Sequence, residues 1–182
     1  NNTTGASNVA VGYAALNVST TGDSNTAVGG NALDANTTGS NLVAVGRHAL
    51  GANTTGERNT SVGKSSLAAN TTGSLLTALG FGALANSTTA NDNTAVGYEA
   101  LNANTTGNQN VGVGVSALYS NTTAANNTAV GYKALLNNTT GERNTAMGAY
   151  SADSVTGGDY NSAFGYNALG ANTTGTHNTA LG

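Results

Sequence analysis

The side chains that could perform acid–base or metal chemistry are few in this sequence. It contains two histidines, eight acidic residues, five basic residues and no cysteine. General acid–base catalysis needs such groups within hydrogen-bond reach of one substrate, and a structural zinc site needs about four ligands. Whether His48, His177 or the carboxylates can meet in this way depends on the elements that position them.

These elements follow from a repeat with a period of 17 residues, of which NTAVGYEALNANTTG at 93–107 is the clearest copy. We number the columns of the repeat from Asn93, so that Gly97 is in column five, and call one copy a coil. The glycine of column five recurs without insertion or deletion at Gly12, Gly29, Gly46, Gly63, Gly80, Gly97, Gly114, Gly131, Gly148, Gly165 and Gly182. A short, fixed period predicts one supersecondary unit stacked into a solenoid.

The repeat favours strands over helices. Thr-Ala-Val beside glycine is typical of short strands joined by turns, and 17 residues leave no room for two helices. We therefore predict an all-β parallel β-solenoid of eleven 17-residue coils, with two or three brief strands per coil and about 4.8 Å between coils. The chain 1–182 is then a single repeat domain, and because it starts and stops inside a repeat we expect it to be a segment of a longer chain.

Two columns are predicted to form the core, and a third is predicted to face a neighbouring chain. Column four, represented by Val96, is apolar in every coil, and column nine is Leu except at Ala152. Column three is always small. Because successive strand residues point to opposite faces, we expect column four inside and column three outside, against another chain. The predicted inter-chain residues are Ala10, Ala27, Ala44, Ala78, Ala95, Ala129, Ala146, Ala163 and Ala180.

The NTTG half of the repeat predicts a turn, since Asn and Gly tolerate positive φ and Asn and Thr side chains bond nearby backbone groups. Asn also recurs in columns one and twelve, where stacked side chains would form amide ladders. The Asn-Thr-Thr triplets match a glycosylation signal, but glycans about 5 Å apart would collide. We therefore expect turn formation from Asn36, Asn53, Asn70, Asn104, Asn121 and Asn172.

The repeat separates the chemically active side chains. All charged residues and both histidines fall in columns six, seven, ten, sixteen and seventeen, which vary between coils and should face solvent. His48 and His177 are about eight coils apart, too far to share a metal or a proton. We therefore predict that the protein is not an enzyme and has no catalytic residue, no metal site and no cofactor.

Charge and hydropathy also limit the partners. The net charge of −3 argues against a nucleic acid or an anionic membrane, since both require a basic face, and no apolar run reaches the roughly 20 residues of a membrane span. We expect no nucleic acid and no membrane contact within this segment. Aromatic residues recur in column six and form a candidate binding stripe for sugar or protein: Tyr13, Phe81, Tyr98, Tyr132 and Tyr166.

The repeat resembles a known family. NTAVGYEAL and its relatives NTSVGKSSL and NSAFGYNAL are similar to the head repeat of trimeric autotransporter adhesins, whose motif runs roughly NSVAIGxxAxA. Asn93, Ala95, Val96 and Gly97 match its Asn, small, aliphatic and Gly positions, whereas the period of 17 and the NTTG extension depart from the family pattern. The resemblance implies a left-handed β-roll, three chains side by side, and a rod on a bacterial surface that binds host or environmental surfaces.

We therefore expect a non-enzymatic structural rod, the head or shaft of an extracellular surface adhesin. Its partners would be itself, as a homotrimer with end-to-end continuation, and a ligand on a host or environmental surface. Similar repeats occur in phage fibres, so a virion tail-fibre shaft or an extracellular filament is the alternative. A lower alternative is an ice-binding solenoid, for which the regularly spaced Thr residues of columns thirteen and fourteen would serve.

Overall fold

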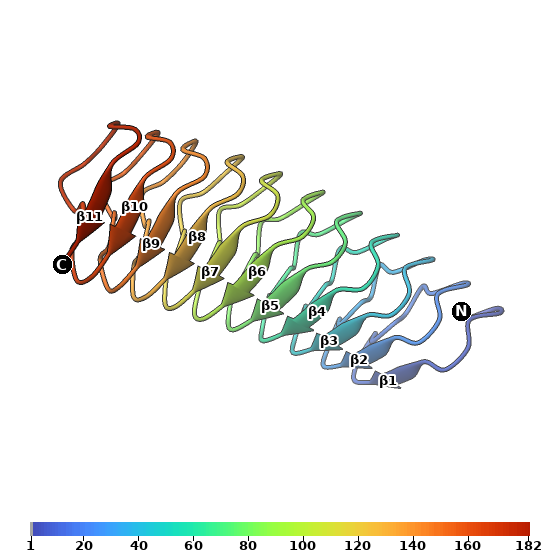
Figure 1. Ribbon diagram of the computed structural model, residues 1–182. Helices are drawn as coiled ribbons and strands as arrows, with labels where there is room; N and C mark the ends of the chain where they lie inside the picture. The colour runs from blue at the N-terminus through green and yellow to red at the C-terminus, as the bar shows by residue number, and fades with distance from the viewer. Residues whose placement is uncertain (1) are drawn as a thin grey trace.

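The computed structural model describes residues 2–182. It is all-β: 11 strands form one parallel sheet in chain order, and no helix occurs among the described residues. The chain winds as a β-solenoid of about 10 turns, with its two ends at opposite ends of the rod (Figure 1). The strands are β1 Val9–Val11, β2 Thr26–Val28, β3 Val43–Val45, β4 Thr60–Val62, β5 Thr77–Leu79, β6 Thr94–Val96, β7 Val111–Val113, β8 Thr128–Val130, β9 Thr145–Met147, β10 Ser162–Phe164 and β11 Thr179–Leu181.

Each strand is three residues long and pairs in parallel register with the next, as Thr94 does with Val111. Within residues 2–182 each repeat contributes one strand, so the prediction of two or three strands per coil is wrong. The reason is that columns seven, nine and seventeen adopt a left-handed backbone conformation, which no strand allows. In one coil these residues are Glu99 (φ 51°), Leu101 (φ 51°) and Asp92 (φ 58°).

The turns and bends between strands are nevertheless joined to the coils on either side. The backbone N–H of Leu101 donates to the carbonyl of Ala117 at 2.9 Å, and that of Thr105 donates to Thr122 at 2.8 Å. Corresponding bonds recur in most coils. The stack is therefore held by hydrogen bonds around much of its circumference and not by the sheet alone.

The small residues of column three point into the coil and those of column four point outward, which is the opposite of the predicted orientation. Ala95 is 0% exposed, whereas Met147 of column four is 43% exposed. The expected inter-chain packing is wrong for the interior coils, where the Ala side chains are buried in their own chain. This correction covers Ala27, Ala44, Ala78, Ala95, Ala129, Ala146 and Ala163; Ala10 is exposed and Ala180 half-buried because the stack ends there.

The opposite wall of the coil explains why column three is small. A Cβ placed on Gly112 would lie 3.3 Å from Cδ1 of Leu101, a column-nine residue. Column three also faces column eight: the hydroxyl of Ser61 hydrogen-bonds the hydroxyl of Ser66 and donates to its carbonyl oxygen. A larger residue in column three would therefore displace the leucines. The neighbour that limits its size is the coil itself.

The prediction that column nine forms a core ladder is confirmed. Leu33, Leu50 and Leu101 are fully buried, and Leu42 and Leu76, which replace Asn in column one, join the same core. Each such leucine stabilises the fold by roughly 1.5–3 kcal/mol. Because the apolar core is narrow, buried polar contacts carry much of the structure.

The amide ladders of columns one and twelve are confirmed. In column one, Oδ1 of Asn93 accepts the backbone N–H of Asn110 at 2.8 Å. In column twelve, Nδ2 of Asn121 donates to Oδ1 of Asn104 at 2.8 Å. Nδ2 of Asn93 and Nδ2 of Asn104 both donate to the carbonyl of Gly107, which ties the two ladders together in one turn. Where the ladders are unbroken, these buried asparagines replace apolar packing with satisfied hydrogen bonds; Oδ1 of Asn70 and Oδ1 of Asn138, next to Ser87 and Val155, have no hydrogen-bond partner among the described residues.

Positive φ was expected in the NTTG turn but lies elsewhere. Asn104 and Gly107 are not among the positive-φ residues, whereas Gly97 of column five has φ +135°. A Cβ on Gly97 would also lie 2.4 Å from the carbonyl oxygen of Gly114 in the next coil. Column five therefore needs glycine for both its conformation and its close approach.

The irregular coil at 149–160 keeps the backbone path of the others, as predicted. Ala152 has φ 49°, close to that of the leucines it replaces, and its N–H donates to the carbonyl of Ala168 at 2.8 Å. Val155, in the position of an Asn, is fully buried in the core. The coil thus loses a Leu and a ladder Asn but gains one aliphatic side chain.

Candidate binding surface

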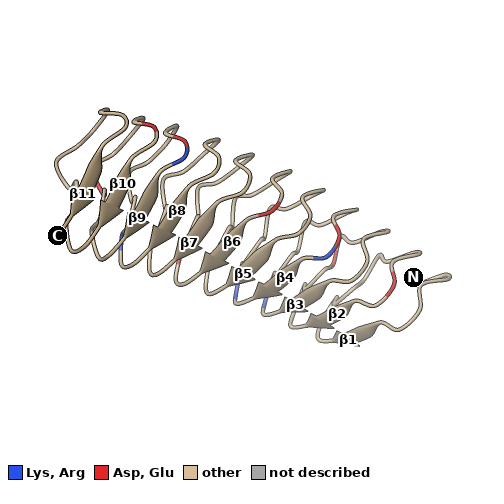
Figure 2. Cartoon of the chain, viewed as in Figure 1, with Lys and Arg blue, Asp and Glu red and all other residues tan. Residues whose placement is uncertain are grey.

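The charged residues lie in the segments between the strands, and none lies on a strand (Figure 2). None of them is buried. Residues 2–182 contain no group of three or more His, Cys, Asp or Glu side chains that could hold a metal ion. The surface therefore offers scattered single charges.

One acidic pair was missed at the sequence level. Glu142 and Asp159 occupy column sixteen in adjacent coils, a spacing of one period that the sequence displays openly. Asp159 accepts the backbone N–H of Glu142 at 2.8 Å, and Glu142 pairs with Arg143 at 3.1 Å. The Asp159 carboxylate thus has a partner in the adjacent coil, and the Glu142 carboxylate has one in its own turn.

The predicted aromatic stripe of column six is exposed but not continuous. Phe81 and Tyr98 stack with ring centroids 5.3 Å apart and planes at 9°. Nζ of Lys64 lies 5.5 Å from the Phe81 ring centroid, within the range of a cation–π contact. Tyr13 is 84% exposed in the first coil and is not in this cluster.

The remaining members of the stripe form a second cluster through a residue that was not predicted. Tyr150 of column seven meets Tyr132 edge-on at 5.2 Å and Tyr166 edge-on at 6.1 Å. Nζ of Lys133 lies 5.2 Å from the ring centroid of Tyr132 and 5.9 Å from that of Tyr150. The structure thus divides the stripe into two aromatic clusters, each with a lysine over it.

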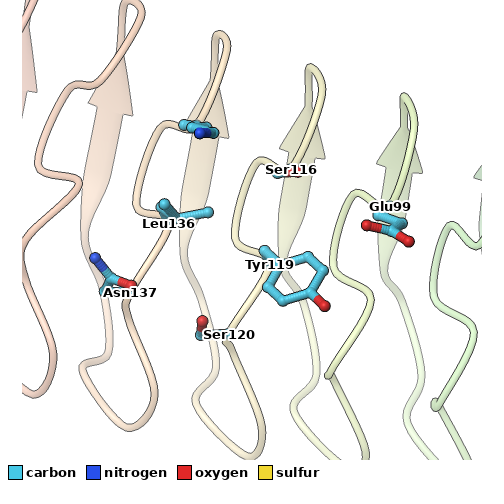
Figure 3. Close-up of a pocket in the computed structure, with 7 residues that line it drawn as sticks. Glu99, Ser116, Tyr119, Ser120, Leu136 and Asn137 are labelled. Atoms are coloured by element: carbon cyan, nitrogen blue, oxygen red, sulfur yellow. The ribbon is translucent and has the colours of Figure 1, made fainter.

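An open groove of about 350 Å³ lies alongside these clusters. Its residues come from columns seven, ten and eleven, which the turns after β6, β7 and β8 bring together (Figure 3). The lining residues are Glu99, Ser116, Tyr119, Ser120, Lys133, Leu136 and Asn137. None of them was predicted as a site residue. The one available signal was Tyr119, the only aromatic residue in column ten.

Neighbouring side chains and burial raise the pKa values of two tyrosines beside the groove. The Glu99 carboxylate raises the pKa of the neighbouring Tyr98 phenol, through its charge and through a hydrogen bond from the phenol. Tyr119 and a small loss of solvation add to this rise in pKa. Farther along, burial raises the pKa of the Tyr150 phenol, and a hydrogen bond with Tyr132 adds to the effect.

The two threonine columns differ in their availability. In column thirteen the hydroxyl of Thr105 donates to the carbonyl of Thr122 at 3.0 Å, and equivalent bonds recur along the rod. Column fourteen, represented by Thr106, is exposed in every coil that carries Thr there. Of these two columns of the turn, only column fourteen presents a free row of threonine hydroxyls; the threonines of column two lie on the strands.

The Asn-Thr-Thr triplets of the interior coils are unsuited to glycosylation in the folded chain. Their asparagines in the interior coils are 0% exposed and bonded within the column-twelve ladder or its turn, as expected for turn formers. Asn172, near the end of the stack, is half-buried and bonds Gly175. An enzyme that adds glycans needs an accessible amide, so the interior signals are masked, whereas Asn2 of the first triplet is exposed.

The outer face of the sheet carries an apolar stripe. Columns two and four share this face because they are two residues apart on a strand. Column two is Thr, Val or Ser and column four is Val, Leu, Met or Phe, with no charged residue in either. Val62, Leu79, Met147 and Phe164 are each more than a third exposed. We call this surface, formed by columns two and four of β1–β11, the strand face.

No family model, curated protein or solved structure matches the chain. Among the described residues there is also no helix with the length and apolar character to cross a bilayer.

Proposed function

We propose that the chain is the non-enzymatic rod of an extracellular surface adhesin that associates with copies of itself. The observation that carries this proposal is the strand face. It is apolar or uncharged in all 11 strands and remains partly exposed in a single chain. Soluble proteins rarely leave so long an apolar row open to water unless another surface covers it.

A second copy of the same chain is the partner that fits the strand face best. The face repeats at every coil and has no charge that would require a complementary partner. We propose three chains side by side, each a left-handed β-roll of eleven 17-residue coils, with the column-four residues meeting between chains. The resemblance to adhesin head repeats and the strand pairing between residues 17 positions apart support this architecture.

The adhesive role is proposed from rigidity and from the character of the remaining surface. A stack tied by hydrogen bonds at each coil holds exposed residues at fixed intervals, which suits multivalent contact with a surface. The protein would act outside the cell on a bacterial surface. A virion fibre or an extracellular filament would use the same rod, and neighbouring sequence would distinguish them.

Adhesion is tested with beads coated with the full chain and held under flow over epithelial cells, extracellular matrix, chitin and silica. We expect retention on at least one surface well above that of albumin-coated beads. Retention no better than albumin on every surface would contradict the adhesive role.

Ice binding is the second candidate, favoured by the exposed threonine row of column fourteen. The row is interrupted at Gly157. Freezing hysteresis with ice shaping at micromolar protein would select this function over adhesion.

A further inference from the structure

We propose that the groove around Tyr119 binds a short, uncharged oligosaccharide lying along the rod. The proposal rests on the proposed adhesive function and names the class of its ligand. The groove is open to solvent and about 350 Å³ in volume, at the lower end of the range for small-molecule sites. A ligand of one to three sugar rings fits that size.

The walls of the groove combine one aromatic face with many hydrogen-bonding groups. Figure 3 shows the Tyr119 ring face-on, between the coils that carry Glu99 and Leu136. A pyranose ring can lay its C–H face on such a ring, which is apolar over its body and polar at its tip. The Leu136 side chain adds an apolar contact suited to the methyl of an N-acetyl group.

The polar lining matches the hydroxyl edges of a sugar. Ser116 and Ser120 each supply a donor and an acceptor. Nδ2 of Asn137 already donates one hydrogen to the carbonyl of Asp153 at 2.9 Å, which leaves its second amide hydrogen and its Oδ1 for a ligand. The Glu99 carboxylate accepts from hydroxyl groups and makes the shorter, stronger bonds of a charged acceptor. Few ligands other than saccharides offer so many hydroxyls beside an apolar face.

The charges of the groove favour a ligand with no net charge. Glu99 and Lys133 oppose each other in sign, so the groove lacks the positive excess that a phosphate or a nucleic acid requires. The Lys133 ammonium is already held over the rings of Tyr132 and Tyr150. It is therefore positioned as a hydrogen-bond donor at one end, while Glu99 is the acceptor at the other.

The spacing of these two groups suits a chain of sugars. They occupy column seven two coils apart, a separation of about 10 Å along the rod at roughly 4.8 Å per coil. Each pyranose ring in an extended oligosaccharide advances by a distance similar to the spacing of one coil, so two rings would cover the distance from Glu99 to Lys133. The ligand would therefore run parallel to the solenoid axis.

The test is titration of the full chain with chitotetraose and with cellotetraose, followed by calorimetry and saturation-transfer NMR. We expect saturable binding of at least one probe at millimolar concentration or below. Tyr119→Ala should weaken it at least about tenfold, as expected for loss of a central aromatic contact. This variant is compatible with the fold because Ala68 and Ala85 occupy the same column in other coils.

Glu99→Gln should weaken binding severalfold, and Tyr160→Ala, which removes an exposed aromatic residue outside the groove and outside both aromatic clusters, should leave it unchanged. Absence of saturable binding for both probes would overturn the proposal, as would binding that survives Tyr119→Ala. Bead retention that persists when both probes fail would leave adhesion standing with a protein ligand in place of a saccharide. Saccharide binding without bead retention would overturn adhesion alone.

Discussion

Replacing Ser87 by Asn should stabilise the solenoid, because the column-twelve ladder is broken at this coil. Within residues 2–182, Oδ1 of Asn70 and Oγ of Ser87 are buried and have no hydrogen-bond partner. Where the ladder is intact, Nδ2 of Asn121 donates to Oδ1 of Asn104 and also to a carbonyl of its own turn. An Asn at position 87 would offer the same donors to Asn70 and a new acceptor to Asn104.

The size of the effect follows from the unpaired groups. A buried acceptor left without a partner costs about 1–3 kcal/mol, and a hydrogen bond contributes about 1 kcal/mol net. We therefore expect Ser87→Asn to raise the local free energy of unfolding by about 1–3 kcal/mol. Asn104→Ser is the matched control, since it creates a second break and should lower stability by a similar amount.

Hydrogen exchange of the coils between 70 and 105 is the suitable assay, because a repeat array need not unfold as one unit. Each 1.4 kcal/mol of added stability slows exchange about tenfold when exchange proceeds through local opening. Unchanged or faster exchange in Ser87→Asn, together with a neutral Asn104→Ser, would refute the reasoning that the ladder stabilises the stack.

Three further predictions concern a recurring backbone conformation, one ionisable side chain and the irregular coil. Gly97→Ala should lower the free energy of unfolding by at least about 3 kcal/mol in urea denaturation, because φ is +135° and a Cβ would lie 2.4 Å from a carbonyl oxygen. A Cβ on Gly107 would also lie close to a backbone carbonyl oxygen, 2.2 Å from that of Ala124, but Gly107 is not a positive-φ residue and Ala90 and Ala124 already occupy its column. Gly107→Ala should therefore cost less than Gly97→Ala, and equal costs would contradict this. Tyr98 should ionise above the ordinary pKa of 10.0, so the stability it contributes is complete below that pH and is lost as pH rises through the raised pKa. Ultraviolet titration should show Glu99→Gln moving the Tyr98 pKa back down, and an unmoved curve would count against the Glu99 contact. The coil at 149–160, with Val155 in place of a ladder Asn, should exchange amide hydrogens faster than its neighbours, and uniform protection along the rod would argue otherwise.

The features that repeat with the period could be predicted from the sequence. Strand position, the Leu ladder of column nine, the Asn ladders and the exposure of charged columns each need only the identity of one column across many coils. Stacking then places like residues next to each other, so the contacts follow directly. No long-range geometry is required.

The orientation of the strand could not be predicted in the same way. A strand of three residues offers a single alternation, and both of its faces are uncharged, so pattern alone leaves two choices. Assignment by side-chain size gave the wrong orientation, because the small Ala95 was placed outside and the larger Val96 in the core. The orientation is decided by the short distance between column three and the Leu101 side chain on the opposite side of the coil. This distance depends on the left-handed backbone of columns seven and nine.

The groove was missed for a related reason. Columns seven, ten and eleven are distant in a linear pattern and are brought together only by the turn that follows each strand. The aromatic prediction found residues of one column, whereas the site combines residues of three. The substitution of Tyr119 into a column of mostly small or polar residues was the single sequence signal.

Multi-angle light scattering of the full chain tests the central claim, that the strand face is covered by copies of the same protein. We predict a mass of three times the 17.7 kDa of one chain. The double variant Val96→Arg with Val130→Arg, on the outer face, should remain folded by circular dichroism and scatter as a monomer. Ala95→Arg, at a fully buried position, should instead prevent folding. A wild-type chain that is folded and monomeric at every concentration, or a double variant that keeps the mass of the wild type, would contradict the account.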